Sequence, residues 1–550
     1  MTGLAGRSIV SVVARISIAF ALGLVTIAAS AQNAPPPAEI HVATHLVQIG
    51  VIVRDKNGAV ADLTKEDFGI FDRGKPQKIG VFTVESPTTA PQPAAAQLLP
   101  PNTFSDLPQA NGPAVRSVTI VLLDNLNTLS GNGHPGYETG SWWMEDLALA
   151  NAKAHLIEFV KTLDPRDRVA IYGLSDTLHV LCDFTSERER LLGILKNYDT
   201  TSRTNRNQVE PGSSHTPVPG VFNALVNAQN LESMAITDER RAEDTMAALH
   251  SIAFHVANIP GRKNLVWLTA NLPFSPAALA LLLSTAQIAA YPVDGRGLLA
   301  RKPPDNTWEM DDQLGGVLGV GMPAQASAPI GIDTMQKLAD ETGGRAFVNT
   351  NDLTGAIRDA VEDSAVTYTL GFYVDSDSLD GKFHELKVQV RRSGLNLRYP
   401  KGYFAVKDTL ATQNERRNNF LIAIKSPLDS SAIPLEVRAD RVDQPTLGSI
   451  TLSGLIGIHD LQLARSGEMH TGALDITVIE QDQTGKVLRE SANRISLRFS
   501  DKQFPAVLKS GVTFRKSVQP QAGVTTLRVL VQDPNTSAIG SLIIPLSGLK

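Results

Sequence analysis

The sequence predicts an α/β protein whose doubly wound central domain stands between a small β-rich module and a C-terminal β-sandwich. Residues 117–124, SVTIVLLD, form an almost unbroken run of β-branched and leucyl side chains, which is typical of a strand buried on both faces of a parallel sheet. Strand-like and helix-like segments then alternate to about residue 365, as in a doubly wound (Rossmann-like) sheet. From residue 431 to 550 short alternating strands and turns predict the sandwich.

The N-terminal residues 1–31 have the pattern of a signal peptide. Arg7 and Arg15 precede an apolar run over residues 16–29, and Ala29-Ser30-Ala31 is a small-x-small cleavage site. The apolar run is about fourteen residues long, whereas a membrane-spanning helix needs about twenty. We therefore expect an exported protein, periplasmic or extracellular, without a transmembrane anchor after cleavage. Cys182 is the single cysteine, so no internal disulfide is expected.

The segments on either side of the central domain have simpler patterns. Residues 40–85 alternate like short strands around the hairpin turn Asn57-Gly58, with a short helical turn capped by Thr64, and predict a small β-rich module. Residues 86–115 are rich in proline and alanine and predict a linker. The type of pattern then assigns 116–406 to the central domain with a β extension, 407–430 to a second linker and 431–550 to the sandwich.

Within the central domain the periods and end signals of the sequence predict each element in order. The expected helices cover 145–163, Ser186 to 198 with a capping box to Glu189, 238–258, 276–289, a segment capped by Asp333 that stops at Gly343-Gly344, and a segment capped by Asp352 that ends near 365. The expected strands cover 168–174, 178–184, 264–269, 291–294 and 345–348. Three further strands between 367 and 403 are expected to extend or flank the central sheet.

Connection lengths favour one edge of this sheet as the binding surface. The connections that enter strands are brief, whereas 125–144, 199–237 and 295–332 are long and fall mostly at the carboxyl ends of strands. Long connections in a compact domain are usually functional or disordered. Open α/β sheets bind ligands at the carboxyl edge. Asp124, which closes the central strand, and Asp294, which closes a later one, are therefore the first candidate site residues.

Composition and motifs exclude several classes of function. The chain carries 51 basic and 56 acidic residues, a net charge of −5, and so lacks the basic field of a nucleic-acid-binding protein. It contains no phosphate-binding loop and no G-x-G-x-x-G motif. His134, His179 and His250 show no metal-ligand spacing. Ser175 follows a strand as a hydrolase nucleophile would, but the second glycine of the nucleophile elbow is missing.

Several blocks in the order of the chain carry a family resemblance. They are VIVRDKNGAVADLTKEDFGIFDRGKPQKIGVF, VTIVLLDNLNT, DRVAIYGLS, GRKNLVWLTANLPF, YPVDGRGL, LADETGGRAF, YTLGFYV and LRYPKGYF. Together they cover about residues 45–405, and they resemble the von Willebrand factor type A domain, more closely the secreted bacterial group of VWFA-related Acidobacterial domain proteins. The C-terminal sandwich is outside this resemblance.

The resemblance implies a protein-binding domain with a divalent cation, such as Mg²⁺, as its candidate cofactor. Such domains hold the cation with a D-x-S-x-S turn, a threonine from a later loop and an aspartate after the fourth strand, because hard cations need oxygen ligands. Asp124 and Thr128 keep two of these positions and are the candidate metal ligands. Leu126 replaces the middle serine, and Ala270 stands where the aspartate is expected. Thr200 or Thr201 could supply the distant threonine. Because Leu126 and Ala270 lack side-chain oxygens, the implied cation site is incomplete.

Two interpretations of Asp124 stay open on the sequence alone. Its carboxylate either contacts a cation or ligand, or it caps the next helix and accepts N–H groups of the loop. Asn127 could supply an oxygen in place of the missing serine, and Asn271 lies beyond the fourth strand at the same edge. Asp294 could belong to the site or form a surface pair with Arg296. Trp142 and Trp143 begin a helix beside this edge and could contact a partner or pack in the core.

These patterns predict an exported, non-enzymatic protein-binding or adhesion-type protein with a protein partner of the cell envelope or surface. The binding candidates are Asp124, Asn127, Thr128, Asn271 and Asp294. One alternative is a structural envelope scaffold or a glycan-binding protein that acts through its β modules. A remote alternative is a hydrolase that uses Ser175.

Overall fold

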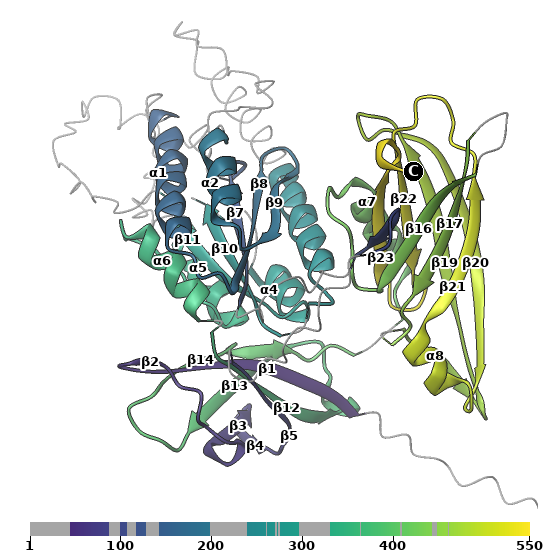
Figure 1. The fold of residues 1–550 in the computed structure, drawn as a ribbon. Coiled ribbons are helices and arrows are strands. Elements are labelled where there is room, and N and C mark those ends of the chain that lie inside the picture. The colour runs from purple at the N-terminus through teal and green to yellow at the C-terminus, as the bar shows by residue number, and fades with distance from the viewer. Residues whose placement is uncertain are drawn as a thin grey trace, which may run out of the picture. The chain divides into compact units, whose positions relative to one another are not determined.

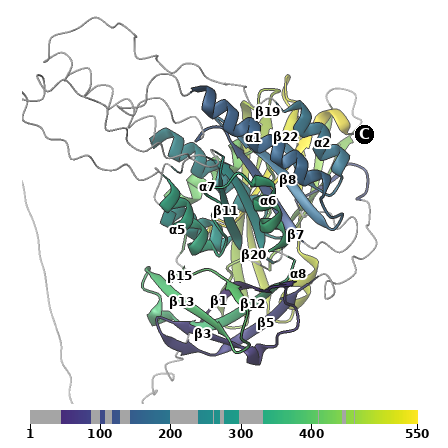
Figure 2. The ribbon, with the colours of Figure 1, turned by 90° about the vertical axis from the view of Figure 1, so that its left-hand side faces the viewer.

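The computed structural model describes most of the chain from Thr44 to Leu549. The described ranges are 44–86, 99–106, 117–127, 142–198, 239–259, 261–269, 272, 276–295, 331–363, 365–407, 410–442, 448–459 and 461–549. The predicted signal peptide therefore lies outside the described residues. Within the ranges above, no helix is both long and apolar enough to cross a membrane. Figure 1 and Figure 2 show the fold in two orientations.

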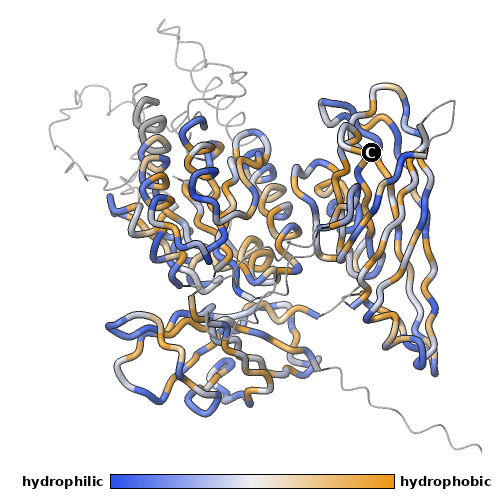
Figure 3. The backbone as a smooth tube through the Cα atoms, viewed as in Figure 1, coloured by the Kyte–Doolittle hydropathy of each residue, from blue (hydrophilic) through white to orange (hydrophobic). Residues whose placement is uncertain are grey.

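The central sheet has the strand order β11-β10-β7-β8-β9. Its strands are β7 (Ser117–Asp124), β8 (Asp167–Leu174), β9 (Leu178–Thr185), β10 (Lys263–Thr269) and β11 (Ile288–Asp294). β7 lies between β10 and β8 and is parallel to both, whereas β9 pairs antiparallel with β8 at one margin. The prediction of a buried central strand over 117–124 is confirmed, bounds included. In Figure 3 the strands of this sheet are mainly orange, as expected for a sheet covered on both faces.

Helices cover both faces of this sheet. They are α1 (Trp142–Lys161), α2 (Arg188–Asn197), a helix over 239–255, α4 (Pro276–Thr285), α5 (Ile332–Thr342) and α6 (Leu353–Glu362). Val121 and Leu123 of β7 share a core with α1, α2 and α6. Ile120 and Leu122 share a second core with helix 239–255, α4 and α5. Successive side chains of β7 thus point to opposite faces of the sheet and contribute to both cores. The central domain is a mixed α/β layer structure.

Some helix ends differ from the sequence predictions, and others agree. The N-cap of α2 is Glu187 rather than Ser186, and that of α5 is Gly331, so the predicted caps at Ser186 and Asp333 are wrong. α4 ends at Thr285, and the apolar residues predicted to continue it begin β11 instead. Asp352 caps α6 as predicted, because its carboxylate accepts the Gly355 N–H at 2.8 Å. Gly343 ends α5 with a left-handed φ of 76°.

The strands after α6 pair with the N-terminal strands rather than with the central sheet. One sheet has the order β14-β1-β12-β5 with β2 on β1, and a second has the order β15-β13-β3-β4. Their bounds are β1 (Thr44–Asp55), β2 (Gly58–Ala59), β3 (Phe68–Asp72), β4 (Lys75–Gln77), β5 (Ile79–Glu85), β12 (Thr367–Asp375), β13 (Phe383–Val390), β14 (Asn396–Arg398) and β15 (Gly402–Phe404).

These two sheets share one hydrophobic core, which corrects the predicted β extension of the central domain. Val51 of β1, Ile70 of β3, Phe372 of β12 and Val388 of β13 belong to that core. β12 lies between β1 and β5, so its hydrogen-bonding edges are both occupied by N-terminal strands. The β-rich module is therefore built from two chain segments, 44–85 and 367–404, that enclose the central domain in sequence.

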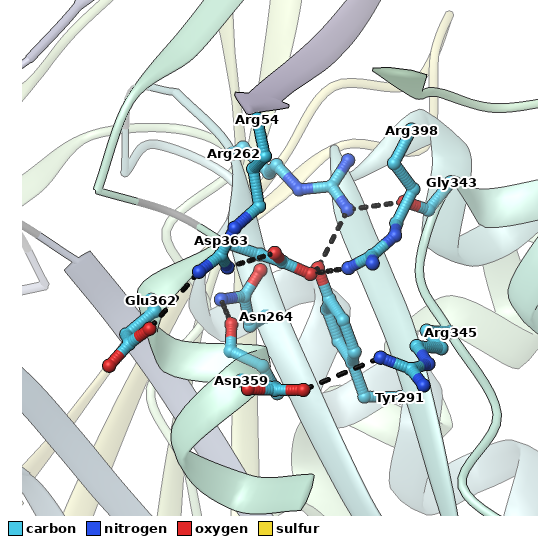
Figure 4. Close-up of polar contacts among 11 residues, drawn as sticks. Arg54, Arg262, Asn264, Tyr291, Gly343, Arg345, Asp359, Glu362, Asp363 and Arg398 are labelled. Carbon is cyan, nitrogen blue, oxygen red and sulfur yellow. Dashed lines mark hydrogen bonds and ion pairs between the residues drawn. The ribbon is translucent and has the colours of Figure 1, made fainter. Parts of the chain in front are cut away.

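A cluster of charged side chains links this split β module to the central domain (Figure 4). Asp363, directly after α6, is 1% exposed and accepts hydrogen bonds from Arg54 of β1 at 3.0 Å and from the Tyr291 hydroxyl at 3.1 Å. Arg398 of β14 forms an ion pair with the same carboxylate. Arg262 donates to the Tyr291 hydroxyl at 3.1 Å and to the Gly343 carbonyl oxygen at 2.6 Å. Residues from β1, β11 and β14 therefore meet at one buried carboxylate, which directly follows α6.

The C-terminal part contains two sheets that face a common core. One has the order β21-β17-β16-β6, and the other has the order β18-β19-β22-β23 with β20 on β19. The bounds are β6 (Thr103–Ser105), β16 (Leu435–Val442), β17 (Ser449–Ile456), β18 (Ala464–Ser466), β19 (Met469–Gln481), β20 (Val487–Ser500), α8 (Phe504–Ser510), β21 (Val512–Val518), β22 (Thr526–Gln532) and β23 (Ile539–Pro545). Val437 and Leu452 of one sheet and Val478 and Val529 of the other share the core.

Both predicted linkers contain ordered structure. Residues 103–105, inside the predicted linker 86–115, form β6 and pair with β16 from Glu436 to Arg438. Residues 413–425, inside the predicted linker 407–430, form α7 (Gln413–Lys425), which Thr412 caps through its hydroxyl. The polar composition of 407–430 reflects a helix of which only Ala423 is buried. The two segments are therefore not plain linkers.

Candidate functional site

The carboxyl edge of the central sheet brings three strand ends together. Leu123 of β7 pairs with Leu268 of β10, and Thr269 of β10 pairs with Asp294 of β11. Asp124 and Thr269 are thus the next residues along neighbouring parallel strands. The sequence-predicted residues Asp124, Asn127 and Asp294 all lie at this edge, as parallel strand ends require.

The carboxylate of Asp124 is enclosed by hydrogen-bond donors. Its Oδ1 accepts the Asn127 backbone N–H at 2.9 Å, and its Oδ2 accepts Asn127 Nδ2–H and Trp267 Nε1–H, each at 2.9 Å. The Thr269 hydroxyl hydrogen-bonds to the same carboxylate. Asp124 is 0% exposed. This arrangement corresponds to the second interpretation of Asp124, a carboxylate that accepts N–H groups of the loop.

Asn127 connects this carboxylate to helix 239–255. Its Nδ2 also donates to Thr245 Oγ1 at 2.9 Å, and the Thr245 hydroxyl donates to the Arg241 carbonyl oxygen at 2.7 Å. Both groups that face Asn127 Nδ2 are therefore acceptors, which fixes the orientation of the amide. Asn127 Oδ1 is buried without a hydrogen-bond partner among the described residues. β7, β10 and helix 239–255 are thus joined by one buried network.

The chemistry of this network is unfavourable for a cation at Asp124. A hard cation needs converging oxygen lone pairs, whereas Asn127 and Trp267 present hydrogens from the backbone, an amide and an indole to this carboxylate. Burial raises the pKa of Asp124, and the hydrogen bonds from Asn127, Trp267 and Thr269 oppose that shift. Within the described ranges, no group of three or more His, Cys, Asp or Glu side chains could hold a metal ion.

The other predicted site residues divide into two groups. Thr128, Ala270, Asn271, Arg296 and both candidate threonines at 200 and 201 lie outside the described residues. Asp294 is described and buried, and its backbone N–H donates to the Phe347 carbonyl oxygen at 2.9 Å. Leu126 is partly buried against the core that contains helix 239–255. Trp142 and Trp143 are the first residues of α1.

The hydrolase candidate Ser175 lies in the turn between β8 and β9 near His179 and Asp176. Ser175 Oγ donates to Asp176 Oδ1 at 2.9 Å and lies 3.0 Å from His179 Nε2. Asp176 Oδ1 is 3.6 Å from the same ring nitrogen. In a catalytic triad the acid instead orients the imidazole through the other nitrogen. Here the serine and the acid share Nε2 of an exposed histidine, so Asp176 does not orient that ring as the acid of a triad does.

Sequence reasoning missed the residue that defines the network, Trp267. It is a fully buried tryptophan in the middle of β10, where an apolar side chain is expected for packing alone. Its indole N–H becomes important only because β10 lies beside β7. Thr245 was missed because it reaches Asn127 only through the packing of helix 239–255 on the sheet. The general rule that a buried tryptophan N–H needs an acceptor could have directed attention to Asp124.

No family model and no curated protein matches the sequence. Solved structures similar to the chain include von Willebrand factor type A proteins. One is a von Willebrand factor type A protein from Catenulispora acidiphila, at 9% identity, covering 86% of this chain and 75% of that chain with a TM-score of 0.25.

Two Bacteroides structures cover a smaller part of the chain. The aerotolerance-related membrane protein from Bacteroides fragilis is 15% identical and covers 44% of this chain and 98% of its own, with a TM-score of 0.25. BatB from Bacteroides thetaiotaomicron is 12% identical and covers 45% of this chain and 98% of its own, with a TM-score of 0.26.

Proposed function

We propose that this chain is an exported, non-enzymatic binding protein that contacts a protein of the cell envelope or surface through the carboxyl edge of its central sheet. In this proposal Asp124 is not a contact residue and holds no metal. It anchors the bases of the segments that make the contact. The observation that carries the proposal is the set of hydrogen-bond donors around the buried Asp124 carboxylate.

The described ends of the three long connections support the choice of this edge. The first begins at Asn125, directly after β7. The second precedes helix 239–255, whose Thr245 contacts Asn127. The third begins at Gly295, whose N–H donates to the Thr269 carbonyl oxygen at 3.1 Å. Each long connection therefore starts or ends beside the Asp124 network, where a single partner could contact all three.

The metal-free part of the proposal is tested by the thermal stability of the full chain. A cation at a hundred times its dissociation constant would stabilise the folded protein by about 2.7 kcal/mol. We expect no change in Tm with Mg²⁺, Mn²⁺ or Ca²⁺ at 10 mM, or with EDTA. A cation-dependent rise in Tm that Asp124→Asn removes would refute this part, and calorimetric titration of the wild-type chain gives a second readout if the variant is unstable.

The contact edge is tested with two matched cysteine substitutions. Thr177→Cys places a thiol in the exposed turn at the carboxyl end of β8, and Arg166→Cys places one in the exposed turn before the same strand. The native Cys182 is buried, so each variant presents one reactive thiol. With a thiol-directed photocrosslinker on intact cells, we expect a discrete crosslinked protein from position 177 and none from position 166. Equal crosslinking at both positions would contradict the assignment of the edge.

A further inference from the structure

His255, the last residue of helix 239–255, faces two groups that can only accept hydrogen bonds. Its Nδ1 lies 2.8 Å from the Asp429 carbonyl oxygen, and its Nε2 lies 3.2 Å from Asp183 Oδ1 on β9. A neutral imidazole has one N–H, so it can donate to only one of the two. The geometry therefore requires either a doubly protonated His255 or a protonated Asp183.

The surroundings of Asp183 favour protonation on the histidine. Asp183 Oδ1 also accepts the Tyr172 hydroxyl at 3.1 Å and the Phe184 N–H at 2.8 Å, so its donors suit an ionised carboxylate. Burial alone would raise the pKa of Asp183, but the hydrogen bonds from His255, Phe184 and Tyr172 outweigh it and lower that pKa. Burial alone would lower the pKa of His255, but Asp183 and the Asp429 carbonyl outweigh it and raise that pKa.

We propose that the protonation state of His255 controls how firmly the segment 426–431 is bound to helix 239–255. The doubly protonated ring stabilises this contact, and part of the stabilisation is lost when the ring loses a proton. The same segment is attached to the helix end by neighbouring groups. The Ser431 N–H donates to the Phe254 carbonyl oxygen at 2.9 Å, and the Ser431 hydroxyl donates to the His255 carbonyl oxygen at 2.8 Å. Asn258 Nδ2 donates to the Ser431 carbonyl oxygen.

Other ionisable groups face this junction. From the segment itself, the Asp429 carboxylate accepts the Ile543 N–H at 2.8 Å, and burial raises the pKa of Asp429 to about 6. Arg528 of β22 donates to the Ala423 and Ser426 carbonyl oxygens, and burial lowers its pKa to about 10. Asp106, after β6, has a pKa raised by burial to about 8, and its buried Oδ2 has no hydrogen-bond partner among the described residues.

The raised pKa values of His255, Asp429 and Asp106 all make the folded chain less stable as the pH rises. The pKa of His255 is higher in the folded chain than in the unfolded chain, so its contribution is complete below about pH 6.5 and is lost as the pH rises through the folded value. Asp429 and Asp106 also bind protons more tightly when folded, and their contributions are lost as the pH rises through about 6 and about 8. The junction should therefore be tightest in mild acid and loosest in mild alkali.

Histidine ring resonances of the full chain test the first step of the proposal. With ¹⁵N-labelled histidine, we expect the His255 ring, identified by its loss in His255→Gln, to carry protons on both nitrogens at pH 6. We expect it to titrate at a higher pH than a histidine in the unfolded chain. A His255 ring that is neutral at pH 6 would overturn the proposal.

Amide hydrogen exchange tests the second step. After correction for intrinsic exchange rates, we expect protection of the Ser431 amide to fall by about twofold or more between pH 5.5 and 8.5 in the wild-type chain. The fall should be smaller in His255→Gln and unchanged in the control His179→Gln. Asp106→Asn and Asp429→Asn measure the share of the two carboxyl groups. If protection falls equally in His255→Gln and the wild type, or does not fall in the wild type, protonation of His255 does not stabilise the contact of segment 426–431.

Discussion

Replacing Asp363 by asparagine should disconnect the split β module from the central domain without changing the shape of the side chain. The Asp363 carboxylate is 1% exposed, forms ion pairs with Arg54 and Arg398, and accepts a hydrogen bond from the Tyr291 hydroxyl (Figure 4). Asparagine keeps one acceptor oxygen but turns an NH₂ group toward the remaining donors. Two guanidinium groups would then lack their common counter-charge.

The size of the effect follows from burial. Breaking a buried ion pair by removing one partner costs about 3–5 kcal/mol, because the other charge stays in the interior without compensation. The Arg54 and Arg398 side chains are 28% exposed, so water can partly compensate them. We therefore expect Asp363→Asn to cost about 3 kcal/mol, at the lower end of that range. The neighbouring Glu362 also pairs with Arg54, at 3.2 Å, but its side chain is 42% exposed.

Glu362→Gln is the matched control, with an expected cost of at most about 1 kcal/mol because exposed ion pairs contribute little. The measurement is hydrogen exchange of the β1 and β12 amides in the full chain, which reports opening of the β module separately from the other domains. Urea unfolding followed by circular dichroism gives the total change in stability. Equal effects of the two substitutions, or a cost below about 1 kcal/mol for Asp363→Asn, would show that the buried carboxylate does not hold the module in place.

Three further substitutions test other parts of the structure. Trp267→Phe removes the indole donor to Asp124 and should cost about 1.5–3 kcal/mol in urea unfolding, and this cost should shrink in an Asp124→Asn background; an unchanged cost would mean that only packing was lost. Asp352→Ala should cost about 1 kcal/mol through the lost cap on α6, visible as faster exchange of the Gly355 amide, whereas unaltered exchange would contradict the cap. Burial lowers the pKa of Lys263 to about 8, below its unfolded value of about 10.4. The stability of the wild type relative to Lys263→Met should therefore rise with pH between about 8 and 10 and stay constant below about pH 8. A stability difference without pH dependence would argue against a buried ammonium.

The parts of the fold with a continuous local signal could be predicted from the sequence. The strand 117–124 is unbroken and bounded by polar residues, and the structure gives the same bounds. The cap at Asp352 was also identified, since a capping carboxylate acts within one helical turn. α4 was predicted too long because its apolar residues continue into β11, and hydrophobic runs cannot separate a buried helix from a buried strand.

The parts that depend on distant pairing could not be predicted. β6 has three residues and exists because Ser105 pairs with Glu436, more than 300 positions later. The strands after α6 have ordinary alternation, and nothing local indicates that β12 pairs with β1 rather than with the central sheet. At the candidate site, Asp124 and Asn127 were identified from position, but their partners Trp267 and Thr245 come from β10 and helix 239–255. The register of β10 against β7 brings Trp267 to the carboxylate, and the packing of helix 239–255 on the sheet brings Thr245 to Asn127.

The division of the β module between two chain segments has a consequence for biosynthesis. β1 leaves the ribosome early, but the strand that completes it, β12, is made more than 300 residues later. Until then the part of β1 that pairs with β12, from Thr44 to Val51, lacks its native strand partner, so the nascent chain must be kept from aggregating while the central domain is translated. A truncated chain that stops before residue 367 should therefore leave residues 44–85 open to protease, and protection of that segment in such a truncation would mean that it folds alone.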